Sequence, residues 1–106
     1  MKEVMVKLIT TFRLKPGFDP EESYQLWIKK HVPYVKKRMY PELRGYILGR
    51  VIHNPGDEFF GAVQLSFDTL EDSKRALNRL LTGPEDEFMK RITDFRRVVI
   101  EEKDVM

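Results

Sequence analysis

The sequence predicts an α+β fold whose elements follow one another in the order β-α-β-β-α-β. Three observations lead to this prediction: two segments carry apolar residues at helical spacing, four segments are rich in β-branched and aromatic residues, and turn-forming Pro and Gly residues separate them. This order is that of the ferredoxin-like fold, a four-stranded antiparallel sheet with its two main helices on one face.

The first strand and the start of the first helix have clear boundaries. The strand is expected over residues 3–13 and ends at the turn sequence Lys15-Pro16-Gly17. Asp19 then supplies an N-cap, Pro20 suits the first helical turn, and Glu22 stands three residues after the cap. These signals predict that a helix begins at residue 20.

An apolar and aromatic stripe marks the buried face of this helix: Tyr24, Trp27, Ile28, His31 and Val35. Pro33 is expected to kink or break the helix near His31, because proline has no N–H to donate to the Lys29 carbonyl. Pro41 ends the helical region.

The second half of the chain predicts a hairpin, a helix and a last strand. Thr69 and Asp72 resemble a capped helix start, and Thr82-Gly83-Pro84 ends that helix. The other expected elements are strands over 44–53 and 59–67 joined by a turn over 54–57, a short third helix over 85–92, and a strand over 96–101.

Alternation along the strands predicts that one face of the sheet stays open. Leu8 and Phe12 fall on the helix-facing side of the first strand. The open face is expected to expose Met5, Lys7, Ile9, Tyr46, Leu48, Arg50, Phe60, Ala62 and Gln64. A second copy packed face to face would bury the apolar members, which predicts a homodimer with a lined cavity between subunits.

The composition excludes several classes of protein. The length of 106 residues predicts a single domain over 1–106, and the absence of Cys excludes disulfide scaffolds, thiolate metal sites and cysteine nucleophiles. The two His have no carboxylates at ligand spacing, so no metal is expected. No segment resembles a membrane span or a signal peptide, which favours a cytoplasmic protein. A net charge of +2 gives nucleic acid little electrostatic attraction.

His31 is the candidate catalytic residue. Its imidazole is suited to proton transfer near neutral pH, and it shares a helix face with Trp27. The alternative is a half-buried histidine that caps carbonyls freed by Pro33. His53 lies at the expected hairpin tip and is interpreted as solvated.

Four polar residues of the expected open face are candidate ligand-binding residues: Lys7, Tyr46, Arg50 and Gln64. Two cations there would favour a carboxylate, phenolate or enolate, or would form ion pairs across a dimer. The β-α-β-β-α-β order also occurs in RNA-recognition domains. The segment 59–67 resembles their aromatic third strand only loosely, because Asp57 and Glu58 precede it in place of a basic residue and glycine.

Several segments together resemble the EthD family of dimeric α+β-barrel proteins. They are Val6-Lys7-Leu8-Ile9, Lys15-Pro16-Gly17, the W-x3-H-x-P pattern of Trp27, His31 and Pro33, Leu43-Arg44-Gly45-Tyr46, and Phe67-Asp68-Thr69-Leu70-Glu71. The resemblance implies the dimeric barrel and assigns His31, Trp27, Pro33 and Tyr46 to the family pattern. Related barrels include polyketide cyclases, dehydratases, isomerases and cofactor-free monooxygenases. Gln64 stands where similar sequences often carry an acidic residue, so the third strand offers His31 no carboxylate.

The leading hypothesis is a cofactor-free enzyme of the cyclase, dehydratase or isomerase type that acts on a lipophilic aromatic or polyketide-like molecule. His31 would move the proton, Lys7 or Arg50 would stabilise an oxyanion, and the remaining ligand-binding candidates are Trp27, Tyr46, Phe60 and Gln64. The alternatives are a non-catalytic binding or accessory protein of an oxygenase system, and an RNA-binding module.

Overall fold

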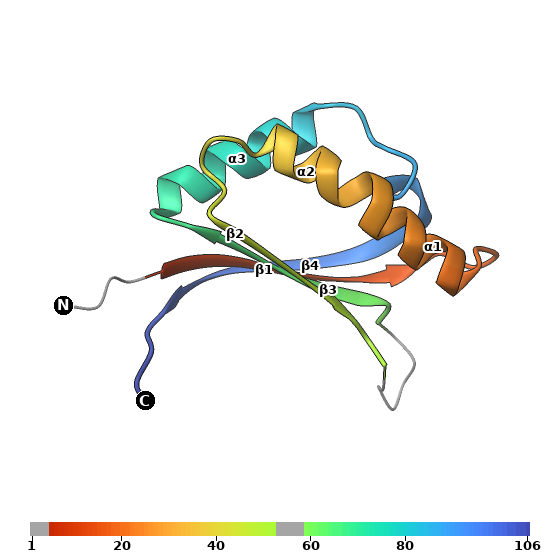
Figure 1. Ribbon diagram of the computed structural model, residues 1–106, viewed down its shortest axis with the longest axis horizontal. Coiled ribbons are helices and arrows are strands. Elements are labelled where there is room, and N and C mark those ends of the chain that lie inside the picture. The colour runs from red at the N-terminus through yellow and green to blue at the C-terminus, as the bar shows by residue number, and fades with distance from the viewer. Residues whose placement is uncertain (1–4, 53–58) are drawn as a thin grey trace.

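The computed structural model describes residues 5–52 and 59–106, and it confirms the predicted β-α-β-β-α-β order. The strands β1 (Met5–Leu14), β2 (Gly45–Arg50), β3 (Gly61–Phe67) and β4 (Ile92–Glu102) form one antiparallel sheet in the order β2-β3-β1-β4. The helices α1 (Pro20–Leu26), α2 (Val32–Arg38) and α3 (Leu70–Thr82) all cover the same face (Figure 1). The expected turn over 54–57 and His53 lie outside the described residues.

Both helix starts have the predicted caps. The Glu22 backbone N–H donates to Asp19 Oδ2 at 2.8 Å, and the Asp72 N–H donates to Thr69 Oγ1 at 3.0 Å. Each cap satisfies a backbone donor that the first helical turn cannot pair internally. The caps therefore fix where α1 and α3 begin, and with them the placement of the helical layer.

The predicted break at Pro33 does not occur. The chain instead winds through one π-helical turn, η1 (Trp27–His31), and continues as α2 with Pro33 in its first turn. The Val32 N–H donates to the Trp27 carbonyl, five residues earlier, and this wider turn accommodates the proline without ending the helix. Trp27 and His31 are both buried by this arrangement.

The register of the sheet corrects the face predicted for β2. Tyr46 pairs with Leu65, which pairs with Leu8 on the helix-facing side, so alternate residues of β2 from Tyr46 to Arg50 also point to the helices. Alternation along a strand separates its residues into two sets, but only the ladder to β3 decides which set faces the core. The prediction that Tyr46, Leu48 and Arg50 lie on the open face is therefore wrong.

Phe60 also lies on the helix side rather than on the open face. It precedes β3 at a bend and therefore leaves the alternation of that strand. Its ring lies 6.0 Å from that of Trp27 and 6.4 Å from that of Phe12, measured between centroids. Phe60 is thus part of the aromatic core.

The open face consists of rows that run across all four strands. One row is Ile47, Gln64, Ile9 and Val98, and the next is Gly45, Ser66, Lys7 and Ile100. Ile47 is 55% exposed and Val98 is 57% exposed. The open face therefore presents apolar side chains, as the sequence predicts, although the contributing residues of β2 differ.

The chain that connects α3 to β4 holds no α-helix. The expected helix over 85–92 is reduced to one 3-10 turn, η2 (Met89–Arg91), which follows an irregular segment. Phe88 inserts its ring into the core, where it stacks on Trp27 at a centroid distance of 5.3 Å. This anchor holds the connection against the helical layer.

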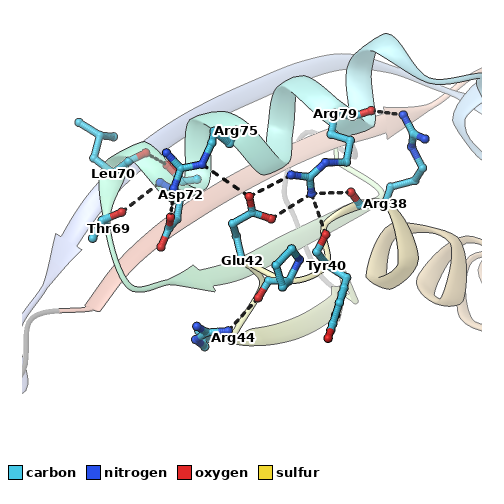
Figure 2. Close-up of polar contacts among 11 residues, drawn as sticks. Arg38, Tyr40, Glu42, Arg44, Thr69, Leu70, Asp72, Arg75 and Arg79 are labelled. Atoms are coloured by element: carbon cyan, nitrogen blue, oxygen red, sulfur yellow. Dashed lines mark hydrogen bonds and ion pairs between the residues drawn. The ribbon is translucent and has the colours of Figure 1, made fainter.

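A cluster of charged residues joins the end of α2 to α3 (Figure 2). Arg79 of α3 donates to both oxygens of Glu42, each at 2.9 Å, and to the backbone carbonyls of Arg38 and Tyr40. Arg38 donates in return to the Arg79 carbonyl. Because Arg38 is the last residue of α2, Arg79 acts as a side-chain cap for that helix.

Within the described part of the chain, no helix has the length and apolar character needed to cross a membrane.

Candidate functional site

A cavity of about 60 Å³ lies between the helical layer and the sheet. Leu8, Phe12, Val63 and Leu65 contribute its floor from the sheet, and residues of α2 and α3 contribute its roof. Most of the lining is apolar, and four side chains that can donate or accept hydrogen bonds interrupt it: Thr10, His31, Tyr46 and Arg97. The cavity thus lies on the helix side of the sheet, whereas the sequence analysis expected a lined cavity on the open face, between two subunits.

His31 faces a carboxylate that the sequence analysis did not identify. Its Nδ1 lies 2.6 Å from Asp86 Oδ2, and the two side chains are 10% and 18% exposed. His31 lies in the π-helical turn η1, and Asp86 lies in the irregular segment before η2. The sequence analysis expected no carboxylate beside His31, because Gln64 of β3 stands where similar sequences often carry an acidic residue. Asp86 supplies that carboxylate from another part of the chain.

Asp86 is ionised in this pair. Burial alone would raise the pKa of its carboxyl, but the hydrogen bonds from His31 and from the Met89 backbone N–H, together with the charge of His31, hold the pKa below its ordinary value. An ionised carboxylate only accepts hydrogen bonds, so the proton of the short contact belongs to His31 Nδ1. In the neutral form of the ring, the lone pair therefore lies on Nε2, the nitrogen that a general base uses.

Two contacts hold the Asp86 segment in place. Asp86 Oδ1 accepts the Met89 backbone N–H at 2.9 Å and so caps η2, while Oδ2 faces His31. The Tyr34 hydroxyl, from the turn of α2 after His31, donates to the Pro84 carbonyl at 2.5 Å. The histidine and its carboxylate are therefore positioned by the same helix.

Tyr46 offers a hydrogen-bond donor on the wall of the cavity. The Trp27 indole Nε1 donates to the Tyr46 hydroxyl oxygen at 3.3 Å, which leaves the Tyr46 proton available. Burial raises the pKa of Tyr46 to about 12, and the charge of Asp86 acts in the same direction. The hydrogen bond from Trp27 opposes this shift. The phenol is therefore protonated near neutral pH and can donate to a ligand oxygen.

The cavity opens between α3 and β4. Its inner residues are buried, with His31 8% exposed, whereas Leu81 of α3 is 49% exposed and Phe95 of β4 is 40% exposed. The guanidinium of Arg97 lies over the Phe95 ring, with Cζ 4.6 Å from the ring centroid. The exposed Arg97 therefore stands at the mouth.

The remaining sequence-predicted site residues lie elsewhere. Lys7, on the open face, forms an ion pair with Glu102 at 2.9 Å, and Gln64 lies on the same face. Arg50 pairs with Glu21 at 2.8 Å. These three side chains and Phe60 do not line the cavity, while Trp27 supports it through Tyr46.

The sequence analysis missed Asp86 and Arg97. Asp86 was assigned to a helix, but its position three residues before Met89 is a cap spacing that could have marked a turn. Arg97 lies beyond a β-bulge in the β1–β4 ladder, where Asp94 has a φ of 55°. The sequence analysis assigned no face to the residues of the last strand, and the pairing of Arg97 with Thr10 is what places Arg97 on the helix-facing side.

Metal-ligating side chains do not gather in threes anywhere in residues 5–52 and 59–106. His31 and Asp86 form a pair of possible donors.

Comparison with known proteins bears on the fold. No family model matches the chain, and no curated protein matches it. An EthD family protein from Bacillus halodurans is 20% identical over 93% of this chain and 99% of its own, with a TM-score of 0.61. A dimeric ferredoxin-like protein from an uncultured marine organism is 17% identical over 98% of both chains, with a TM-score of 0.68.

Hydroxynitrile lyase from Passiflora edulis is 14% identical over 99% of both chains, with a TM-score of 0.66. The resemblance to EthD proteins and dimeric ferredoxin-like proteins is thus confirmed at the level of the fold.

Proposed function

We propose that this protein is a cofactor-free enzyme that catalyses proton transfer on a lipophilic small molecule bound in the cavity between the helices and the sheet. The observation that carries the proposal is the His31–Asp86 pair, whose atoms Nδ1 and Oδ2 lie 2.6 Å apart at an otherwise mostly apolar cavity. A histidine oriented by a carboxylate is a general base of the kind that abstracts a proton next to a carbonyl.

Three polar side chains have distinct roles in this chemistry. His31 Nε2 takes the proton, and Asp86 holds the ring in the required tautomer and stabilises the imidazolium that forms. Tyr46 donates a hydrogen bond to the substrate carbonyl, where negative charge develops as the enolate forms. Returning the proton to another atom gives isomerisation, and loss of a leaving group gives elimination; both belong to the expected lyase or isomerase class.

The size of the cavity limits what it encloses. A cavity of about 150 Å³ holds one benzene molecule, and this cavity measures about 60 Å³. An aromatic or polyketide-like substrate would therefore insert its reacting end past Leu81 and Phe95, and the rest would lie at the open mouth. The hydroxynitrile lyase of similar fold supports a small-molecule lyase on this scaffold.

Deuterium exchange tests the proposal without knowledge of the natural substrate. A panel of small ketones and β-keto esters is incubated with the protein in D₂O, and exchange at the α-carbon is followed by NMR. We expect the wild type to accelerate exchange of at least one compound, and His31→Asn to lower that rate by about 10²-fold or more.

Asparagine is chosen because its side-chain N–H can replace the Nδ1 donor to Asp86 while Nε2 is lost. Binding of each compound to both variants is measured by NMR shift changes. Equal exchange with wild type and His31→Asn, for every compound that binds, would contradict the catalytic role.

That result would instead favour the second candidate function, a non-catalytic binding protein for a hydrophobic compound. The apolar lining of the cavity supports this candidate, because such a lining retains a lipophilic ligand without chemistry. We do not propose an RNA-binding module, because Phe60, an aromatic residue of the segment 59–67 that loosely resembles an RNA-binding strand, lies on the helix side.

We further propose that the chain forms a homodimer through its open sheet face. Ile47 and Val98 belong to one row of this face and are each more than half exposed, and the similar protein from a marine organism is dimeric. Exposed apolar side chains in one row across the face of a sheet are typical of an interface. Light scattering should give twice the chain mass, and Ile47→Lys should give a monomer; a wild-type monomer would contradict the dimer.

A further inference from the structure

The mouth of the cavity carries a cation that the described chain does not neutralise. Lys7 and Arg50, the cations expected at the site, each have a carboxylate partner. Arg97 has none among residues 5–52 and 59–106, and its described contact is the Phe95 ring. Desolvation lowers the pKa of Arg97 from its ordinary value, as expected for a partly buried cation that has no anionic partner. The guanidinium nevertheless keeps its charge.

A hydroxyl accompanies this guanidinium. Thr10 pairs with Arg97 across the β1–β4 ladder, so both side chains lie on the helix-facing side, and both line the cavity. Thr10 is 8% exposed, so its side chain is largely shielded from solvent. A guanidinium and a hydroxyl on one wall are donors suited to a carboxylate, the group with which arginine makes its strongest hydrogen bonds.

We propose that Arg97 and Thr10 bind the carboxylate of the substrate, which is therefore a small lipophilic organic acid. The inference rests on the proposed function, because it takes the inner cavity as the place of reaction. The substrate then has its carboxylate at the mouth, an apolar middle against Leu77, Leu80 and Phe95, and its reacting end near His31. Arg97 is a specificity-determining residue in this arrangement and does not take part in proton transfer.

A matched pair of probes tests the carboxylate site. Hexanoate and hexanamide have nearly the same shape and differ in charge, and each is titrated into ¹⁵N-labelled protein. For the wild type we expect the Kd of hexanoate to be lower than that of hexanamide by about tenfold or more. Arg97→Gln should remove this preference, and its amide spectrum reports whether the fold is intact.

Arg96→Gln is the control variant. It removes the same charge from the adjacent residue, which pairs with Thr11 and therefore lies on the opposite face of the sheet. The carboxylate preference should persist in this variant. Failure of hexanoate to bind, equal binding of the two probes to the wild type, or the same loss in Arg96→Gln as in Arg97→Gln would overturn the proposal.

His31→Asn separates this inference from the proposed function. The variant retains Arg97 and Thr10, so its preference for hexanoate should equal that of the wild type. If His31→Asn keeps both the preference for hexanoate and the wild-type rate of deuterium exchange, only the catalytic proposal is contradicted. If His31→Asn loses the preference for hexanoate, the result counts against a separate carboxylate site.

Discussion

The Arg79–Glu42 pair at the end of α2 and the polar side chains at the cavity differ in how completely they are paired. In the cluster at the end of α2, Arg79 uses its two terminal nitrogens on Glu42 and on two backbone carbonyls, as Figure 2 shows. At the cavity, His31 Nε2, the Tyr46 proton and the Arg97 guanidinium retain donor or acceptor capacity toward the enclosed space.

This difference separates structural from functional charge. A group whose hydrogen bonds are all made within the protein can stabilise the fold but has nothing to offer a ligand. A group that is partly paired is oriented and still able to bind, as Asp86 orients His31 through Nδ1. Variants of the first group should therefore change stability, and variants of the second should change activity or binding.

The largest expected effect concerns the carboxylate that orients His31. Asp86→Asn removes the charge that fixes Nδ1–H and stabilises the imidazolium, so the deuterium-exchange rate should fall by about 10²-fold. The matched variant Glu87→Gln removes a carboxylate from the next residue, which pairs with Arg91 instead. Equal rates for Asp86→Asn and the wild type would show that Asp86 belongs with the structural charges.

The next effect is on stability. Arg79→Met keeps the apolar stem but leaves Glu42 and the end of α2 without their donors, so the Tm should fall by more than about 5 °C. Arg13→Met is the control, because the Arg13 side chain forms an exposed ion pair with Asp94 at 3.3 Å. Probe binding at the cavity should be unchanged in both variants. A loss of binding in Arg79→Met would contradict the separation between residues that stabilise the fold and residues that bind the ligand.

A glycine beneath Trp27 links the fold to the site. A Cβ at Gly61 would lie 2.5 Å from Trp27 Cη2, and the fully buried indole has little room to move. Gly61→Ala should lower the free energy of unfolding by about 1–3 kcal/mol in urea denaturation and weaken probe binding through Tyr46. Gly49→Ala meets the Ala62 carbonyl oxygen at 3.3 Å and should change stability by less than about 1 kcal/mol; equal losses would contradict this role of Trp27.

The smallest effect is the pH dependence of the structural cluster. The Arg79 hydrogen bond lowers the pKa of Glu42 to about 2 from an ordinary value of 4.5. A lowered pKa contributes stability that is fully present above pH 4.5 and is lost as the pH falls toward 2. Thermal unfolding should show the Tm difference between wild type and Glu42→Gln shrinking over this range, and a difference independent of pH would contradict the assignment.

Local signals explain why much of the fold could be predicted. The caps at Asp19 and Thr69 act over three residues, and the helical and alternating periodicities also act between close neighbours. His31 and Tyr46 were named as site candidates from their residue types and the family pattern, and the structure places both at one cavity.

The residues that the sequence analysis misplaced or missed depend on distant contacts. Tyr46 faces the helices because of its register with Leu65, and Arg97 faces them because it pairs with Thr10 of β1. Asp86 meets His31 across 55 positions of the chain, after an irregular segment with no periodicity. No pattern within a short window of sequence contains these relations.

The sequence by itself therefore determined the order of strands and helices, the helix starts and the presence of an open apolar face. The tertiary structure decided which side of β2 is buried, on which side of the sheet the cavity lies, and which carboxylate and cation accompany His31 and Tyr46. The physical reason is that secondary structure follows from interactions between near neighbours, whereas register and site geometry follow from packing between elements far apart in the chain.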